Sequence, residues 1–97
     1  MKSVLITFDQ AHYEQILATL DRLNCRGFTH MEKVQGRGSK TGEPHYGSHA
    51  WPAMNSAIIT VVEDHRADLL LQALKEMDER KEQLGLRAFV WDIVNSI

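Results

Sequence analysis

Residues 36–55 of this 97-residue chain, GRGSKTGEPHYGSHAWPAMN, contain no Val, Ile, Leu or Phe. The stretch holds four of the six glycines and both prolines of the chain. A simple hairpin turn takes roughly two to five residues, and connections longer than about 12–15 residues are functional or disordered. We therefore predict a long loop over residues 36–54, with a regular half of the domain on each side of it.

The half that precedes this loop has the pattern of strand, helix and strand. Residues 1–8 are rich in β-branched side chains and apolar on both faces, which is typical of a central strand. Asp9 offers an N-cap oxygen, and apolar side chains three and four apart predict a helix from there to about Asn24. Residues 28–35 alternate and predict a second strand.

The half that follows the loop repeats this order. Residues 57–63, AIITVVE, predict a second central strand, and Asp64 can cap a helix from about residue 65 to 83. Gly85 is placed as its C-cap, and residues 86–93 predict the last strand. The buried stripe of the helix is expected at Leu70, Leu74, Met77 and Leu84, widened by Leu69 and Ala73.

Two such halves predict an α+β fold, a ferredoxin-like βαββαβ sandwich in a single domain over residues 1–97. Its four-stranded antiparallel sheet would carry both helices on one face. The other face would remain apolar, and an exposed apolar face of this size predicts association into a closed oligomer. The residues expected on that face are Leu5, Ile58, Val62, Phe89, Trp91 and Ile93.

Composition excludes several classes of protein. Eleven Lys and Arg stand against 13 Asp and Glu, so the chain lacks the basic face of a nucleic-acid-binding protein. The single Cys25 rules out an internal disulfide and a zinc site built from cysteines. No stretch has the 18 apolar residues of a membrane helix, and the first residues are too short for a signal peptide. We expect a cytoplasmic protein that is not integral to a membrane.

Glu43, His45 and His49 are candidate metal ligands. Two imidazoles and a carboxylate within seven residues suit Zn or Cu, and His-x3-His is a usable spacing. A third fixed ligand could be Glu43, His30 on the preceding strand, or a group of a neighbouring subunit. The alternative is that both histidines are exposed loop residues that bind nothing.

Gly36, Arg37 and Gly38 begin a second candidate site. Closely spaced glycines expose backbone N–H groups that can cradle an anion, and Arg37 adds charge; the alternative is a glycine-rich hinge. Tyr46 and Trp51 are candidates for contact with a partner, although Trp51 could equally pin the base of the loop against the sheet. No Ser or Cys nucleophile has a base at recognisable spacing, so we do not expect an enzyme.

The element order, together with residues 34–51, VQGRGSKTGEPHYGSHAW, resembles the PII signalling family, and most closely its short PII-like branch. Val34 followed by Gly36-Arg37-Gly38 matches the Val and Gly-x-Gly at the root of that family's T-loop. The resemblance implies a homotrimer whose sheets line the interior, with small ligands in clefts between subunits. Gly36, Arg37 and Gly38 would face such a cleft, with Arg87 as the only basic residue near the last strand. The T-loop, here residues 36–54, would dock onto a partner protein such as a membrane transporter.

The chain departs from the family at one functional loop. Family members that bind ATP carry T-G-x-x-G-D-G between the second helix and the last strand, whereas the connection expected here is only residues 83–86. The absence of this B-loop puts nucleotide binding in the family's manner in doubt. Some PII-like proteins accompany metal-transport systems, which favours Zn or Cu at His45 and His49.

Three hypotheses follow from the sequence. The first is a trimeric PII-like regulatory protein that senses a small ligand at intersubunit clefts and contacts a partner through residues 36–54. The alternative is a metal-binding protein of metal handling that uses the loop histidines. An enzyme with a composite intersubunit site ranks last.

Overall fold

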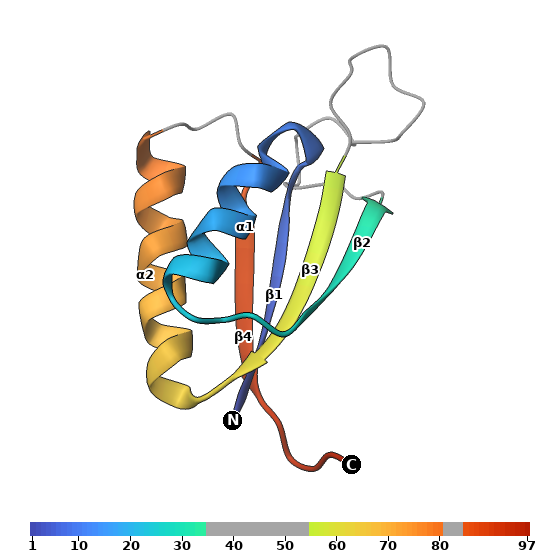
Figure 1. Ribbon diagram of the computed structural model, residues 1–97, viewed down its shortest axis with the longest axis vertical. Helices are drawn as coiled ribbons and strands as arrows, with labels where there is room; N and C mark the ends of the chain where they lie inside the picture. The colour runs from blue at the N-terminus through green and yellow to red at the C-terminus, as the bar shows by residue number, and fades with distance from the viewer. Residues whose placement is uncertain (35–54, 81–84) are drawn as a thin grey trace, which may run out of the picture.

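The computed structural model describes residues 1–34, 55–80 and 85–97. They form one antiparallel sheet in the order β2-β3-β1-β4, and both helices cover the same face of it (Figure 1). The predicted α+β, ferredoxin-like βαββαβ architecture is confirmed. The elements are β1 (Lys2–Asp9), the 3-10 turn η1 (Gln10–His12), α1 (Tyr13–Arg22), β2 (Phe28–Val34), β3 (Asn55–Val62), α2 (Asp64–Arg80) and β4 (Arg87–Asp92).

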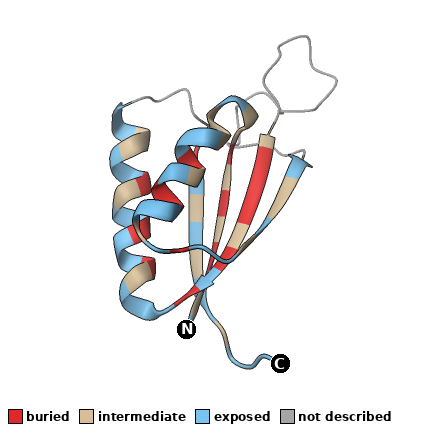
Figure 2. Ribbon diagram, in the orientation of Figure 1, coloured by how far each residue is buried: buried red, intermediate tan, exposed pale blue. Residues whose placement is uncertain are grey.

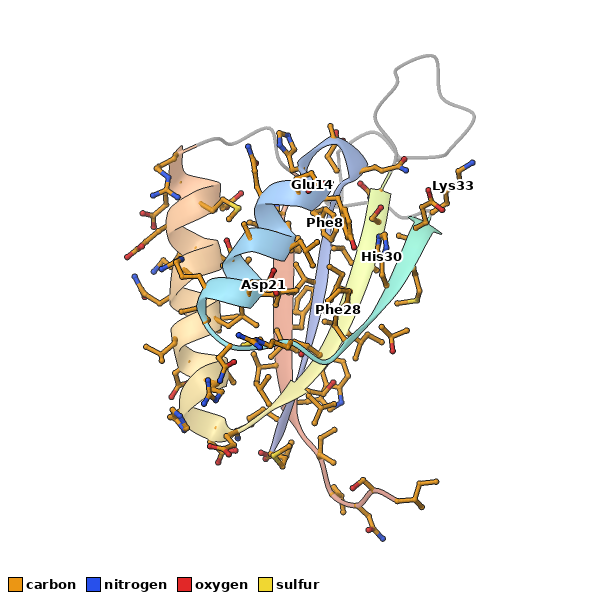
Figure 3. All side chains as sticks on the ribbon, viewed as in Figure 1. Phe8, Glu14, Asp21, Phe28, His30 and Lys33 are labelled. Atoms are coloured by element: carbon orange, nitrogen blue, oxygen red, sulfur yellow. The ribbon has the colours of Figure 1, made fainter. Side chains whose placement is uncertain are left out.

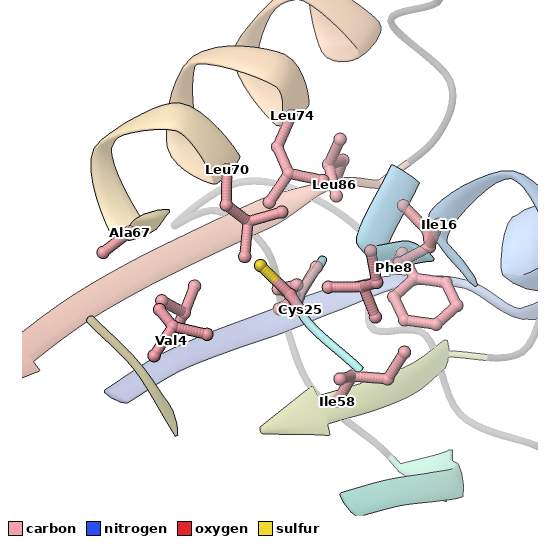
Figure 4. Packing of buried hydrophobic residues seen from close by; sticks show 12 residues of the cluster. Val4, Phe8, Ile16, Cys25, Ile58, Ala67, Leu70, Leu74 and Leu86 are labelled. Atoms are coloured by element: carbon pink, nitrogen blue, oxygen red, sulfur yellow. The ribbon is translucent and has the colours of Figure 1, made fainter. Parts of the chain in front are cut away.

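Strand β1 is central because it pairs with β3 on one side and β4 on the other. Its alternate residues Val4, Ile6 and Phe8 are fully buried beneath the helices. Burying a side chain of this size contributes roughly 1.5–3 kcal/mol. Figures 2 and 4 show this core between the sheet and the helices, with Leu70 of α2 among the packed side chains.

The first helix begins as the sequence indicated, with one difference in its first turn. The Asp9 carboxylate accepts a hydrogen bond from the Ala11 amide at 2.9 Å. The turn that Asp9 caps is 3-10, and α-helical geometry starts only at Tyr13. The helix ends at Arg22, and Asn24 adopts the left-handed conformation with φ of 61°, which Asn tolerates better than most residues.

The second helix differs from the prediction on two points, its N-cap and the exposure of Leu69. Glu63, rather than Asp64, precedes it, and the Glu63 carbonyl accepts from the amides of Arg66 and Ala67. Leu69 is 54% exposed, since the side that faces the core runs through Ala67, Leu70 and Leu74. The described part of the helix reaches Arg80, and both its predicted continuation to residue 83 and the predicted contribution of Leu84 lie outside the described residues.

Gly85 has a φ of +60°, the left-handed conformation expected of a C-cap. It stands two positions before β4 and five positions beyond Arg80, the last described residue of α2. Because residues 81–84 lie outside the described residues, its role as the C-cap of α2 stays a prediction.

The face of the sheet away from the helices is apolar, as predicted, but two of its members were assigned wrongly. Ile58 lies beside Ile6 in the register of the β1–β3 pair, so it is fully buried in the core, and Val62 is also buried there. Along each strand, the residues that alternate with the core residues lie on this other side of the sheet. We call this side the open face. The open face contains Leu5, Ile59, Val61, Phe89 and Trp91, while Ile93 follows the end of β4.

Candidate functional site

The candidate site lies at one end of the sheet. Residues 35–54 connect β2 to β3 at this end, and the end of β1 and the start of β4 lie beside them. Asn55, the first residue of β3, pairs with Asp9 on β1 and with Val34 on β2. Arg87, the first residue of β4, pairs with Thr7 two positions before Asp9. We define this place as the loop-root end, formed by Asp9, Val34, Asn55, Gly85 and Arg87.

Asn55 supplies a polar group inside the loop-root end. A Cβ placed on Gly85 would lie 3.9 Å from the Asp9 amide nitrogen and 4.0 Å from Asn55 Oδ1. The Asn55 amide therefore reaches across β1 toward the backbone of Gly85. Its Oδ1 is buried and has no hydrogen-bond partner among residues 1–34, 55–80 and 85–97. Buried acceptors are nearly always paired, so this oxygen is a candidate contact for a ligand.

Arg87 supplies a positive charge at the same end. Its guanidinium donates to the Leu86 carbonyl at 2.7 Å, and its side chain is exposed. Arg87 pairs with Thr7 and, by alternation along β4, belongs to the same side of the sheet as the open face. A guanidinium keeps its charge at any physiological pH and binds carboxylate or phosphate with two parallel hydrogen bonds.

A groove of about 480 Å³ lies on the helix side, between α2 and β4. Its wall includes Leu74 and Leu86, which are buried, and Lys75 and Asp78 of α2. Arg87 lies at the boundary of this groove. Neither the groove nor the role of Asn55 was predicted from the sequence, because each depends on residues far apart in the chain.

Most of the predicted site residues lie outside the described part of the chain. These are Gly36, Arg37, Gly38, Glu43, His45, Tyr46, His49 and Trp51. Their roles in binding ligand, metal or partner therefore stay predictions, and only Arg87 is placed. The described residues contain no group of three or more His, Cys, Asp or Glu that could hold a metal ion.

His30, considered from the sequence as a further metal ligand, lies in β2 and packs against the start of α1. Its ring stacks on Tyr13 with centroids 4.3 Å apart. Its Nε2 is buried and is the second atom, with Asn55 Oδ1, that has no hydrogen-bond partner within the described ranges.

Comparison with known proteins decides the family. The family model described as nitrogen regulatory protein P-II matches residues 1–97. The chain belongs to the P-II family. The PII resemblance predicted from the sequence is thus confirmed, and with it a place among regulatory signalling proteins.

Solved PII-like structures share the fold. CPII of Thiomonas intermedia K12, bound to ADP, AMP and bicarbonate, superposes with a TM-score of 0.79 at 24% identity, covering 95% of this chain and 84% of CPII. CPII bound to ADP and bicarbonate gives a TM-score of 0.75 at 27% identity with the same coverage. A proposed PII-like signalling protein of Thermus thermophilus gives 0.69 at 24% identity, covering 95% and 85% of the two chains.

A comparison with curated proteins finds no match for this P-II family member. Within the described residues, neither helix is long and apolar enough to cross a membrane.

Proposed function

We propose that this P-II family member is a trimeric regulatory protein of the cytoplasm that senses a small anionic ligand at the loop-root end. The observation that carries the proposal is the buried Asn55 Oδ1, which lacks a partner in the described chain and lies where residues 35–54 leave the sheet. The exposed Arg87 guanidinium begins β4 at the same end. A hydrogen-bond acceptor and a cation together suit a ligand that has both a donor and a negative charge.

Two ligand classes meet this description, and both are found with one solved relative. CPII is described with ADP and bicarbonate at 27% identity to this chain. A nucleotide offers an amino donor and phosphate oxygens, and bicarbonate offers a hydroxyl and a carboxylate-like edge. The missing B-loop removes phosphate contacts known in the ATP-binding branch, so we propose weaker phosphate contacts centred on Arg87.

The trimer accounts for the open face. Phe89, Trp91 and Val61 are 57%, 46% and 45% exposed in the isolated subunit. Burying such side chains between copies contributes roughly 25 cal/mol per Å² of apolar area removed from water. Closed rings of identical subunits are the usual outcome, and three sheets facing one axis would place neighbouring loop-root ends along shared clefts.

We further propose that residues 36–54, with Tyr46 and Trp51, contact a partner protein such as a transporter. Ligand at the loop-root end would then set the conformation of this segment, because only Gln35 separates it from Val34 of the loop-root end. A variant carrying Tyr46→Ala and Trp51→Ala should bind ligand as the parent does and lose the partner. Loss of both activities would contradict the division of roles.

Calorimetric titration with ADP and, separately, with bicarbonate tests the ligand site. Arg87→Ala should weaken binding about tenfold or more, the effect of losing a charge-assisted hydrogen bond. Asn55→Ala should weaken it as well. Arg26→Ala is the matched control, because Arg26 is an exposed arginine just before β2, at the opposite end of the sheet. Binding that is absent, or equal in Arg87→Ala and Arg26→Ala, would overturn the assignment, and native mass spectrometry of the same samples reports the subunit count.

A further inference from the structure

Strand β2 carries a bulge of one residue just before its end. From Phe28 to Met31 the strand keeps one register with β3, in which Met31 opposes Ala57. At Val34, which opposes Asn55, the register has shifted by one. Glu32 and Lys33 together therefore stand opposite Ser56 alone. Bulges of this kind concentrate beside functional sites, where they redirect side chains.

The Ser56 hydroxyl holds the bulge in place. Ser56 is fully buried, and its Oγ donates to the Glu32 carbonyl at 2.6 Å. The bulge also lets Glu32 and Lys33 both be exposed, whereas strict alternation would turn Glu32 to the helix side with Phe28 and His30. In Figure 3 the Lys33 side chain projects away from the end of β2, and His30 lies over the sheet.

The two buried side-chain polar atoms that lack partners in the described chain flank this bulge. They are His30 Nε2 and Asn55 Oδ1. If the bulge were removed, Lys33 would oppose Asn55, and Glu32 would fall on the same face as His30, two residues further along. A lysine ammonium donates to an amide oxygen, and a carboxylate accepts from a ring N–H. Each unpartnered atom would thus gain a neighbour of matching chemistry.

We propose that β2 has two registers, the bulged one of the structure and an unbulged one, and that Ser56 is the positioning residue that holds the first. The bulged register keeps the Ser56–Glu32 bond and leaves Glu32 in water. The unbulged register gives up that bond and brings Glu32 beside His30 and Lys33 beside Asn55. Since a one-residue shift moves the following side chains to the other face, the side chain that opposes Asn55 changes from apolar Val34 to cationic Lys33.

Nuclear magnetic resonance of the ligand-free protein tests this proposal independently of any ligand. Cross-strand proton contacts distinguish Val34 opposite Asn55 from Lys33 opposite Asn55. In Ser56→Ala we expect the Lys33–Asn55 contacts to appear and exchange broadening to increase at residues 31–34. Retention of the Val34–Asn55 contacts alone, without added broadening, overturns the proposal.

Thr60→Val is the matched control. Thr60 carries another buried β3 hydroxyl, which donates at the same 2.6 Å to the carbonyl of Gly27, the residue just before β2. Its loss should leave the register near Asn55 unchanged. If Ser56→Ala does not fold, a variant that combines Glu32→Gln with Lys33→Met tests whether β2 has two registers. Both side chains are exposed in the structure, and only the unbulged register uses their charges. Relaxation dispersion at residues 31–34 should fall in this variant, and dispersion equal to that of the parent overturns the proposal.

Discussion

Tyr13 and His30 stack with their ring centroids 4.3 Å apart and their planes inclined by 18°. The Phe8 ring also lies near Tyr13, with centroids 6.4 Å apart and planes again inclined by 18°. The three rings come from the end of β1, the start of α1 and the middle of β2. The stack therefore ties the first helix to the edge strand that leads into residues 35–54.

Tyr13→Leu should lower the free energy of unfolding by about 1–2 kcal/mol, because it removes a stacked aromatic pair and keeps most of the apolar contact. Urea denaturation followed by circular dichroism measures the change. His12→Ala is the control, since His12 precedes the helix and its Nδ1 forms a hydrogen bond with the exposed Gln15 side chain at 3.1 Å. In a double-mutant cycle with His30→Ala, a coupling energy near zero would show that the rings do not stabilise each other.

The sequence predicted the number, order and approximate bounds of the elements, because periodicity and turn residues are local signals. It could not decide which side chains of a strand that is apolar on both faces point into the core. Ile58 and Ile59 are chemically equivalent, and only pairing with Ile6 decides which one enters the core. The adjacent Leu69 and Leu70 show the same limit on a helix, where the second is buried and the first is 54% exposed.

The candidate site was predictable only in part. Gly36, Arg37 and Gly38 are a local pattern, whereas Asn55 gains its importance from Gly85, thirty positions later, and from the intervening β1 backbone. The bulge in β2 is invisible without its partner strand. Such features arise from long-range pairing, which a single sequence does not encode locally.

The ion pair between Lys2 and Asp92 joins β1 to β4 and predicts a pH dependence. The hydrogen bond from Lys2 and its charge lower the pKa of the Asp92 carboxyl below its ordinary value. Because the folded-state pKa is depressed, the stabilisation is present above the unfolded-state pKa and is lost as the pH falls through the folded-state pKa. Carbon-13 titration should show the pKa of Asp92 rising in Lys2→Met. An unchanged Asp92 pKa in that variant would mean that the pair does not persist in solution.

The same pair acts on Lys2 with the opposite sign. The hydrogen bond to Asp92 raises the pKa of the Lys2 ammonium, so this contribution is present below the unfolded-state pKa and is lost as the pH rises through the folded-state value. The Asp92 side chain is largely exposed and that of Lys2 partly so, and added salt should weaken the effect. Asp92→Asn should remove this pair's contribution to the pH dependence of the free energy of unfolding at both the acid and the alkaline end. Asp21→Asn, on the exposed side of α1, should leave both contributions unchanged.

Cys25 should resist thiol reagents until the protein unfolds. The side chain is 1% exposed, and burial raises the pKa of its thiol. Less thiolate is then present at a given pH, and the thiolate is the reactive species. Reaction with an aromatic disulfide reagent should follow the urea unfolding transition measured by circular dichroism. Rapid reaction of the native protein would show that the segment between α1 and β2 opens without global unfolding.

The open face should determine the oligomeric state. Phe89→Asp places a charge where the proposed trimer buries an aromatic ring, so the variant should dissociate to monomers in native mass spectrometry and light scattering. Leu69→Asp is the matched control, since Leu69 is 54% exposed and Phe89 57%, but Leu69 lies on α2 on the other side of the sheet. A buried, unpaired carboxylate costs several kcal/mol at each of three equivalent interfaces, whereas the same charge in water on α2 costs almost nothing. Dissociation in Leu69→Asp with an intact Phe89→Asp oligomer would move the interface to the helices, and a monomeric parent protein would contradict the trimer itself.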